Sequence, residues 1–302
     1  MKKEKNVVGN NAVLVSLNIR TWSANVIDSN VSQKVATEHG TDQKLGRFWK
    51  TLLPKTKGSP LALIYAIERE ARTFHYANTL PFMHDGIRIL TTANYMPYMD
   101  KIRELRSRME KEVAMFLNDY ELAKAQAQAE LKTLFREEDY PTRDGVARKF
   151  SLAVDVLPMP KTDAFEGTEL PDQDVAQVKQ DLERELALTF QRANEDLWTR
   201  LYGCVQQMHT RLSGDPAFLR ESAVDSAKEL LGLLPRLNVT NDERLEEMRS
   251  KLDTAFAGVS ASALRQDTVL RNQAVDEVAA IEKMMAGFMG GAPAKLELKN
   301  AA

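Results

Sequence analysis

The sequence predicts an α+β protein that is mainly α-helical, with a small β-sheet head, a long antiparallel helical arm resembling a coiled coil, and a C-terminal helical segment. Three observations support this fold class. Residues 97–135 and 171–213 place apolar side chains at steps of three and four, as in a helix with one buried face. Three short segments alternate apolar and polar residues, as half-buried strands do. Beyond residue 213, helix caps and helix stops follow one another.

The composition limits the class of protein. The 302 residues are 43% hydrophobic and 28% charged, with a net charge of −2. Such a chain can bury a core of its own, and its overall charge does not draw it to nucleic acid or membranes. The single cysteine, Cys204, excludes an internal disulfide and a multi-cysteine zinc site. No apolar run reaches the ~18 residues that a membrane span needs, so we expect a soluble, cytoplasmic protein.

The head is predicted to comprise residues 13–170, after a disordered N-terminus at 1–12. Within the head we expect, in order, a strand at 13–20, helices at 31–40, 41–53 and 61–75, a strand at 86–90, the long helix 97–135, a short helix at 142–149 and a strand at 152–157. The three strands lie on both sides of a long helix in the sequence, so they are expected to form one small sheet at its base.

The two long helices would each be roughly 60 Å long at ~1.5 Å per residue. Their apolar stripes, which include Phe116 and Phe190, are too narrow for a fully buried helix and too long for an isolated one. The simplest partner of helix 97–135 is helix 171–213, in an antiparallel pair.

The C-terminal region, 171–289, is predicted to be helical throughout. Ser213 and Gly214 end the second long helix, and three further helices follow. One begins at Asp215-Pro216, one is opened by the capping box Thr240–Glu243, and the last runs from Ser260 to about Met289. A flexible tail is expected at 290–302.

Several stretches in a fixed order resemble a family of unknown function that is encoded mainly by bacteriophages and mobile plasmids. They are Leu14–Asp28, Val31–Gly40, Gly46–Pro54, Asn94–Met99, Leu134–Pro141 and Lys149–Pro160. The resemblance extends over roughly residues 13–213. Members of that family are often encoded near a MoxR- or CobS-like AAA+ ATPase, which implies a role in a multiprotein machine. The family has no established catalytic residues, so the resemblance assigns none here.

One stretch, 44–57, combines five basic residues with aromatic side chains and contains no acid. Basic groups can follow phosphates while aromatic rings stack on bases, so its candidate nucleic-acid-binding residues are Lys44, Arg47, Trp49, Lys50, Lys55 and Lys57. The alternative is a short helix whose Leu45, Phe48, Leu52 and Leu53 enter the core while the lysines face water. We favour this structural interpretation, in which Trp49 is a core residue and changes at the lysines are nearly silent.

The sequence predicts no catalytic residue, no metal site and no cofactor. The four histidines form no H-x-x-x-H pair, and Gly-rich phosphate loops and nucleophile motifs are absent. Cys204 is expected to be an inert thiol on the apolar stripe. Basic residues at the start of helix 97–135, such as Lys101 and Arg108, alternate with acids and are expected to form a solvated face of ion pairs.

We therefore expect a non-catalytic interaction or assembly module of a phage or mobile-element complex, with an AAA+ ATPase as a candidate partner. The alternative function is nucleic-acid binding through 44–57. Some apolar residues of the two long helices, such as Leu122 and Leu188, lie off the faces that would pair with each other, and they predict self-association. We expect no membrane partner.

Overall fold

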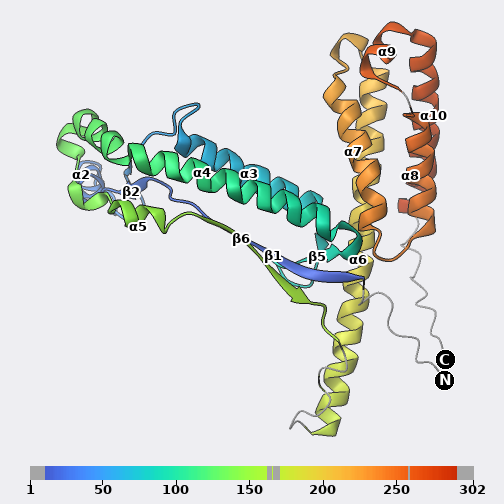
Figure 1. Cartoon of the computed structure of the whole chain (residues 1–302), viewed down its shortest axis with the longest axis horizontal. Coiled ribbons are helices and arrows are strands. Elements are labelled where there is room, and N and C mark those ends of the chain that lie inside the picture. The colour runs from blue at the N-terminus through green and yellow to red at the C-terminus, as the bar shows by residue number, and fades with distance from the viewer. Residues whose placement is uncertain (1–10, 162–164, 166–170, 258, 291–302) are drawn as a thin grey trace. The chain divides into compact units, whose positions relative to one another are not determined.

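The computed structural model describes residues 11–161, 165, 171–257 and 259–290. Its strands are β1 (Ala12–Arg20), β2 (Asn25–Ile27), β3 (Trp49–Thr51), β4 (Leu80–Pro81), β5 (Arg88–Thr91) and β6 (Ser151–Pro158). Its α-helices are α2 (Ser29–Glu38), α3 (Pro60–Ala77), α4 (Thr92–Leu131), α5 (Arg143–Ala147), α6 (Asp172–Ser213), α7 (Glu221–Leu237), α8 (Glu243–Ala255), α9 (Ala261–Gln266) and α10 (Thr268–Gly290). Short 3-10 helices are η1 (Lys132–Leu134), η2 (Glu137–Asp139) and η4 (Pro216–Phe218). The protein is α+β and mainly α, as predicted (Figure 1).

A four-stranded sheet has the order β4-β5-β1-β6. In it, Leu14 of β1 lies opposite Ile89 of β5, and both side chains are buried. The three predicted strands are β1, β5 and β6. Strands β2, β3 and β4 were missed because segments of two or three residues are too short to show an alternation.

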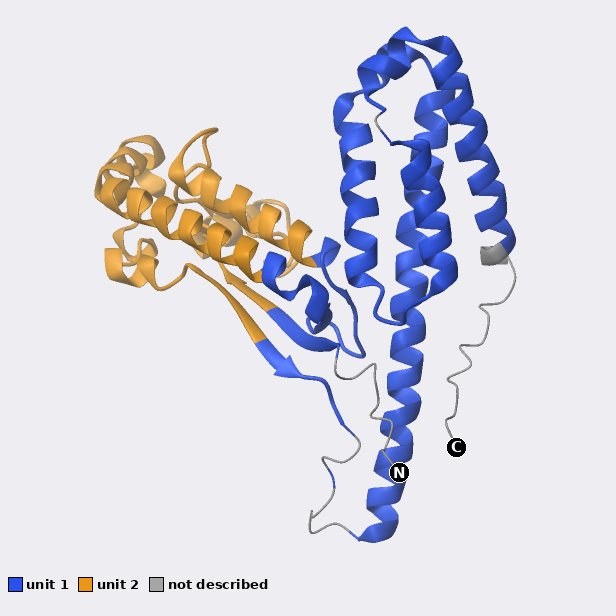
Figure 2. Cartoon of the chain, turned by 45° about the vertical axis from the view of Figure 1, so that its right-hand side comes forward, with its two compact units in different colours: residues 1–16, 76–98, 156–302 blue, residues 17–75, 99–155 orange. Residues whose placement is uncertain are grey.

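The chain divides into two compact units (Figure 2). Unit 1 comprises 1–16, 76–98 and 156–302, and unit 2 comprises 17–75 and 99–155. The predicted boundary at residue 170 therefore does not coincide with a boundary between the units.

Unit 1 has its core along the second half of α6, where Leu197, Leu201 and Val205 are fully buried. This part of α6 packs against α7, α8 and α10. Its Arg200 donates hydrogen bonds to the backbone carbonyls of Ala77 and Thr79, and thereby holds the end of α3 and the start of β4. The first half of α6 extends beyond the other helices of the unit (Figure 1).

Unit 2 is built around an aromatic cluster on α4. Phe116, which is 5% exposed, lies 6.2 Å from Trp22, 5.8 Å from Tyr120 and 5.9 Å from Phe150 between ring centroids. The Tyr120 hydroxyl donates to the Pro141 carbonyl, which holds the turn after α4 against the helix. Burial raises the pKa of Tyr120 to about 12, so this hydroxyl stays protonated.

Both long helices thus find partners for their buried stripes inside their own units. For α4 the partners include Trp22 and Phe150, and for α6 they are mainly α7, α8 and α10. The sequence had predicted that the two helices cover each other. Neither buried stripe depends on that antiparallel pair, because the C-terminal helices and the aromatic residues of the head already cover them.

The other differences from the prediction have local causes. Residues 41–53, predicted as a helix, instead form a loop that leads into β3. The predicted last helix is split into α9 and α10, because Asp267 accepts hydrogen bonds from the amides of Val269 and Leu270 and so starts a new helix. Helix α4 begins at Thr92 and not at Pro97, since β5 leads directly into it, and Pro97 lies inside the helix.

The predicted disordered N-terminus and flexible tail fall largely outside the described residues, although Ala12 already belongs to β1 and α10 reaches Gly290. Among the helices that the structure describes, none has a stretch long and apolar enough to cross a membrane.

Candidate functional site

The basic and aromatic stretch 44–57 is presented by a small antiparallel hairpin of β2 and β3. In its register Trp49 lies opposite Ile27, and Lys50 lies opposite Val26. Neighbouring residues of a strand point to opposite faces, so Trp49 and Lys50 project in opposite directions. Trp49 is 61% exposed, whereas Lys50 is 2% exposed.

Trp49 belongs to a group of exposed side chains that we call the Trp49 face. Leu45 is 83% exposed and Phe48 is 38% exposed, and the side chains of Lys44 and Arg47 are also exposed. Large apolar side chains and cations are therefore exposed together along one short stretch of the chain. Exposed apolar patches can mark interaction sites in soluble proteins, which makes this stretch a candidate.

The backbone beneath the Trp49 face is held by hydrogen bonds to the start of α2. The Phe48 amide donates to the Ser32 hydroxyl at 2.9 Å, and the Phe48 carbonyl accepts from the Asp28 amide at 3.0 Å. Asp28 is also the N-cap of α2, since its carboxylate accepts from the amides of Asn30 and Val31. The exposed aromatic residues are thus carried by a firmly bonded backbone.

Lys50 anchors the hairpin from its inner side. Its ammonium lies 2.6 Å from Asp139 Oδ2 and 3.6 Å from Asp28 Oδ2, and it donates to the Leu134 carbonyl at 2.7 Å. Two carboxylates and a carbonyl compensate a charge that would be costly to bury alone. Lys50 is therefore a structural residue, and its ammonium group is not accessible to a ligand at the surface.

Asp28 is the second charged member of this anchor. Its hydrogen bond from the Val31 amide, together with the nearby charges of Arg136 and Lys50, keeps the pKa of its carboxyl below the usual value against the opposing effect of burial. Arg136 lies 3.7 Å from the Asp28 carboxylate. Asp28 therefore stays ionised opposite Lys50.

The remaining predicted residues are exposed but differ in their surroundings. The ammonium of Lys55 lies 3.6 Å from the centre of the Tyr65 ring, a cation–π contact, and Lys57 is exposed in the following turn. Of the candidate nucleic-acid-binding residues, the structure leaves five accessible and excludes the buried Lys50. The accessible ones are Lys44, Arg47, Trp49, Lys55 and Lys57.

The structure also changes the interpretation that the sequence favoured. We had expected Trp49 in the core and silent lysines at the surface. Instead Trp49 is exposed and one lysine is buried, because the segment forms a strand and not a helix. Sequence reasoning missed Asp139 and Arg136 as partners of this segment, because they follow the far end of α4 in the chain.

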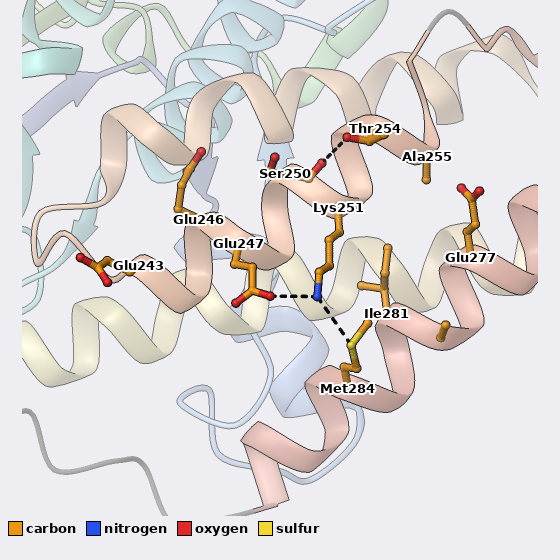
Figure 3. Close-up of a pocket in the computed structure, with 11 residues that line it drawn as sticks. Glu243, Glu246, Glu247, Ser250, Lys251, Thr254, Ala255, Glu277, Ile281 and Met284 are labelled. Carbon is orange, nitrogen blue, oxygen red and sulfur yellow. Dashed lines mark hydrogen bonds and ion pairs between the residues drawn. The ribbon is translucent and has the colours of Figure 1, made fainter.

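A second candidate surface lies in unit 1, where α8 and α10 form an open groove of about 640 Å³ (Figure 3). Four glutamates stand along it, and Ile281 and Met284 contribute apolar surface. The sequence analysis did not single it out. The glutamates of α8 at steps of three and four, Glu243, Glu246 and Glu247, were a signal that could have identified an acidic helix face.

The other groups considered from the sequence have structural roles. Lys101 and Arg108 form ion pairs with Glu70 and Glu104, as expected for a solvated face. Cys204 packs against the core of unit 1, and burial raises the pKa of its thiol to about 11, which makes it a poor nucleophile. Within the described parts of the chain, no three histidine, cysteine or acidic residues are grouped as metal ligands.

Comparison of the chain with protein-family models, with curated proteins and with solved structures finds no match.

Proposed function

We propose that the protein is a non-catalytic binding module of a multiprotein complex and that the Trp49 face is its contact surface. The observation that carries the proposal is the 61% exposure of Trp49 on a hairpin whose inner side is anchored by Lys50. Tryptophan and arginine are the residue types that dominate binding energy at protein interfaces. Because hydrogen bonds and an ion pair anchor the backbone on either side of Trp49, less backbone freedom is lost on binding, which favours affinity.

The resemblance of residues 13–213 to a phage- and plasmid-encoded family supports a place in a mobile-element complex in the cytoplasm of a bacterial host. The neighbourhood of AAA+ ATPase genes in that family supports such an ATPase as the partner. The exposed apolar side chains of Leu122, at 64% exposure, and Leu188, at 40%, support self-association. Light scattering that gives a mass above 34.0 kDa would agree with self-association, and a monomer would oppose it.

A capture experiment with matched variants tests the proposed contact surface. Immobilised protein is exposed to extract of the native host, and bound proteins are identified by mass spectrometry. The variant Leu45→Ala/Trp49→Ala should lose a partner that the unmodified protein retains. The control Leu63→Ala/Met115→Ala removes exposed apolar groups of α3 and α4 in the same unit and should retain that partner. Equal capture by both variants would exclude the Trp49 face as the contact.

Nucleic-acid binding is the second candidate function, and a specific observation favours it. Lys44 and Arg47 are exposed a few residues before the exposed Trp49 in the chain, which supports a site that offers both cations and a stacking ring. Single-strand binding by such surfaces weakens steeply with salt, and loss of one stacked aromatic residue costs ~1–3 kcal/mol per base.

Fluorescence anisotropy with a labelled single-stranded DNA separates the two functions. Nucleic-acid binding predicts micromolar affinity at physiological salt, which falls as salt rises and is lost in Lys44→Glu/Arg47→Glu. The control Arg69→Glu/Lys111→Glu changes the charge equally at exposed positions elsewhere in unit 2 and should bind as before. Absence of binding by the unmodified protein would leave the protein-contact function as the one supported.

A further inference from the structure

The groove between α8 and α10 has an apolar floor and walls of small residues. Ile281 is buried at its base, and Met284, which is 38% exposed, lies at its side. Ser250, Ala255 and Ala280 are small enough to leave the space between the helices open. Helix α8 directs its large apolar side chains inward, where Leu245, Met248 and Leu252 are buried. The groove is therefore a solvent-facing feature of a well-packed bundle.

The charged residues that line the groove are mostly acidic, with four glutamates and one lysine. Lys251, its single cation, lies 2.9 Å from Glu247 and approaches Met284 Sδ at 3.9 Å (Figure 3). Glu246 is paired with Arg249 at 2.7 Å. Glu243 and Glu277 take part in no ion pair within the described residues, and both are exposed. Two unpaired carboxylates thus stand at opposite ends of an apolar floor.

The dimensions suit one helix. The lining residues of α8 run from Glu243 to Ala255, which is about 18 Å along the helix axis. A third helix laid along this line would cover Met284, Ala255 and Ala280 with its apolar face and would bring its flanks to the glutamates. Recognition of an amphipathic helix by an apolar groove is a recurrent mode of protein association.

We propose that the α8–α10 groove binds an amphipathic helix of a partner protein, with an apolar face flanked by lysine or arginine. The acidic rim selects a basic helix by charge complementarity, while Met284 and the small apolar residues Ala255 and Ala280 contact its apolar side chains. The site belongs to unit 1 and shares no residue with the Trp49 face, so it adds a second contact surface.

Binding of a model peptide to the full chain tests the proposal. The probe is a labelled helix of about 18 residues, made of leucine and lysine with all leucines on one face, because shorter helices form poorly in water. Fluorescence anisotropy should show saturable binding. A peptide of the same composition in scrambled order, which has no apolar face, should bind at least about tenfold more weakly.

Matched variants locate the binding site. Glu243→Lys/Glu277→Lys should weaken binding about tenfold, since two attractive pairs become repulsive. The control Asp225→Lys/Glu229→Lys makes the same change in charge at exposed positions of α7 and should stay within about twofold. Ala280→Trp should fill the groove and weaken binding without changing any charge. Circular dichroism melting checks that each variant is folded.

Four outcomes would overturn the proposal. Equal loss in the two charge variants would show unspecific attraction, and full binding by a folded Ala280→Trp would place the peptide elsewhere. A dimer that Glu243→Lys/Glu277→Lys converts to a monomer of 34.0 kDa would make a second copy the occupant. Tighter peptide binding after removal of residues 291–302 would instead make the chain's own C-terminal residues the occupant.

Discussion

The ammonium of Lys50 in β3 lies 2.6 Å from the carboxylate of Asp139 in η2, and this ion pair ties the hairpin to the segment that follows α4. The hydrogen bond from Lys50 to the Leu134 carbonyl reinforces the same connection. Because Lys50 is held inside, its neighbour Trp49 must face outward. The exposure of Trp49 in unit 2 thus accompanies a buried charge on the other face of the same strand.

Loss of the Lys50 ammonium should destabilise the protein. Lys50→Ala leaves the carboxylates of Asp28 and Asp139 without their shared cation, and breaking a buried pair costs ~3–5 kcal/mol. Urea unfolding measures the change in the free energy of unfolding. Lys57→Ala, at an exposed position, should change it by less than about 0.5 kcal/mol. Similar stabilities of the two variants would show that the Lys50 anchor does not stabilise the fold.

The stability of the protein should decrease in acid partly through Asp28. Its pKa in the folded protein lies below the usual value of about 3.9, so the folded state binds a proton less readily than the unfolded chain. Its stabilising contribution is therefore complete above that usual pKa and is lost as the pH falls through the folded-state pKa. Unfolding of the unmodified protein and of Asp28→Asn, measured from neutral to acidic pH, should show a difference in stability that shrinks in acid. A difference independent of pH would contradict this prediction.

Truncation of Trp49 should leave the fold intact. Because Trp49 is 61% exposed, Trp49→Ala should change the free energy of unfolding by less than about 0.5 kcal/mol. Trp22, which is 7% exposed and packs on Phe116, provides the contrast, and Trp22→Ala should cost ~3–5 kcal/mol. Thermal melting followed by circular dichroism compares them. A strongly lowered melting temperature for Trp49→Ala would show that Trp49 packs in the core and contradict this prediction.

Phe116 should be a principal contributor to the stability of unit 2. It is 5% exposed and contacts three other aromatic rings, so Phe116→Ala should cost ~3–5 kcal/mol. Leu122→Ala, on an exposed position of the same helix, should cost less than about 0.5 kcal/mol. The two variants differ in burial while sharing a helix, so denaturant unfolding of both separates packing from helix propensity. Equal effects would mean that the aromatic cluster adds no packing energy.

Much of the secondary structure could be predicted from the sequence because its signals are local. The apolar period predicted α4 and α6, and alternation predicted β1, β5 and β6. Caps also act over a few residues: Asp28 begins α2 and Asp242 begins α8 through hydrogen bonds to the next amides. The missed elements, such as β3 and the break at Asp267, were either very short or started by a cap inside an apolar pattern.

The sequence by itself determined the mainly helical α+β class and directed attention to the stretch 44–57. Only the tertiary structure decided which of its side chains face water. The register of Trp49 with Ile27 sets the two faces of β3, and Asp139, from a distant part of the chain, compensates Lys50 on the inner one. Local periodicity carries no information about a partner that distant, whereas burial of a charge depends entirely on that partner.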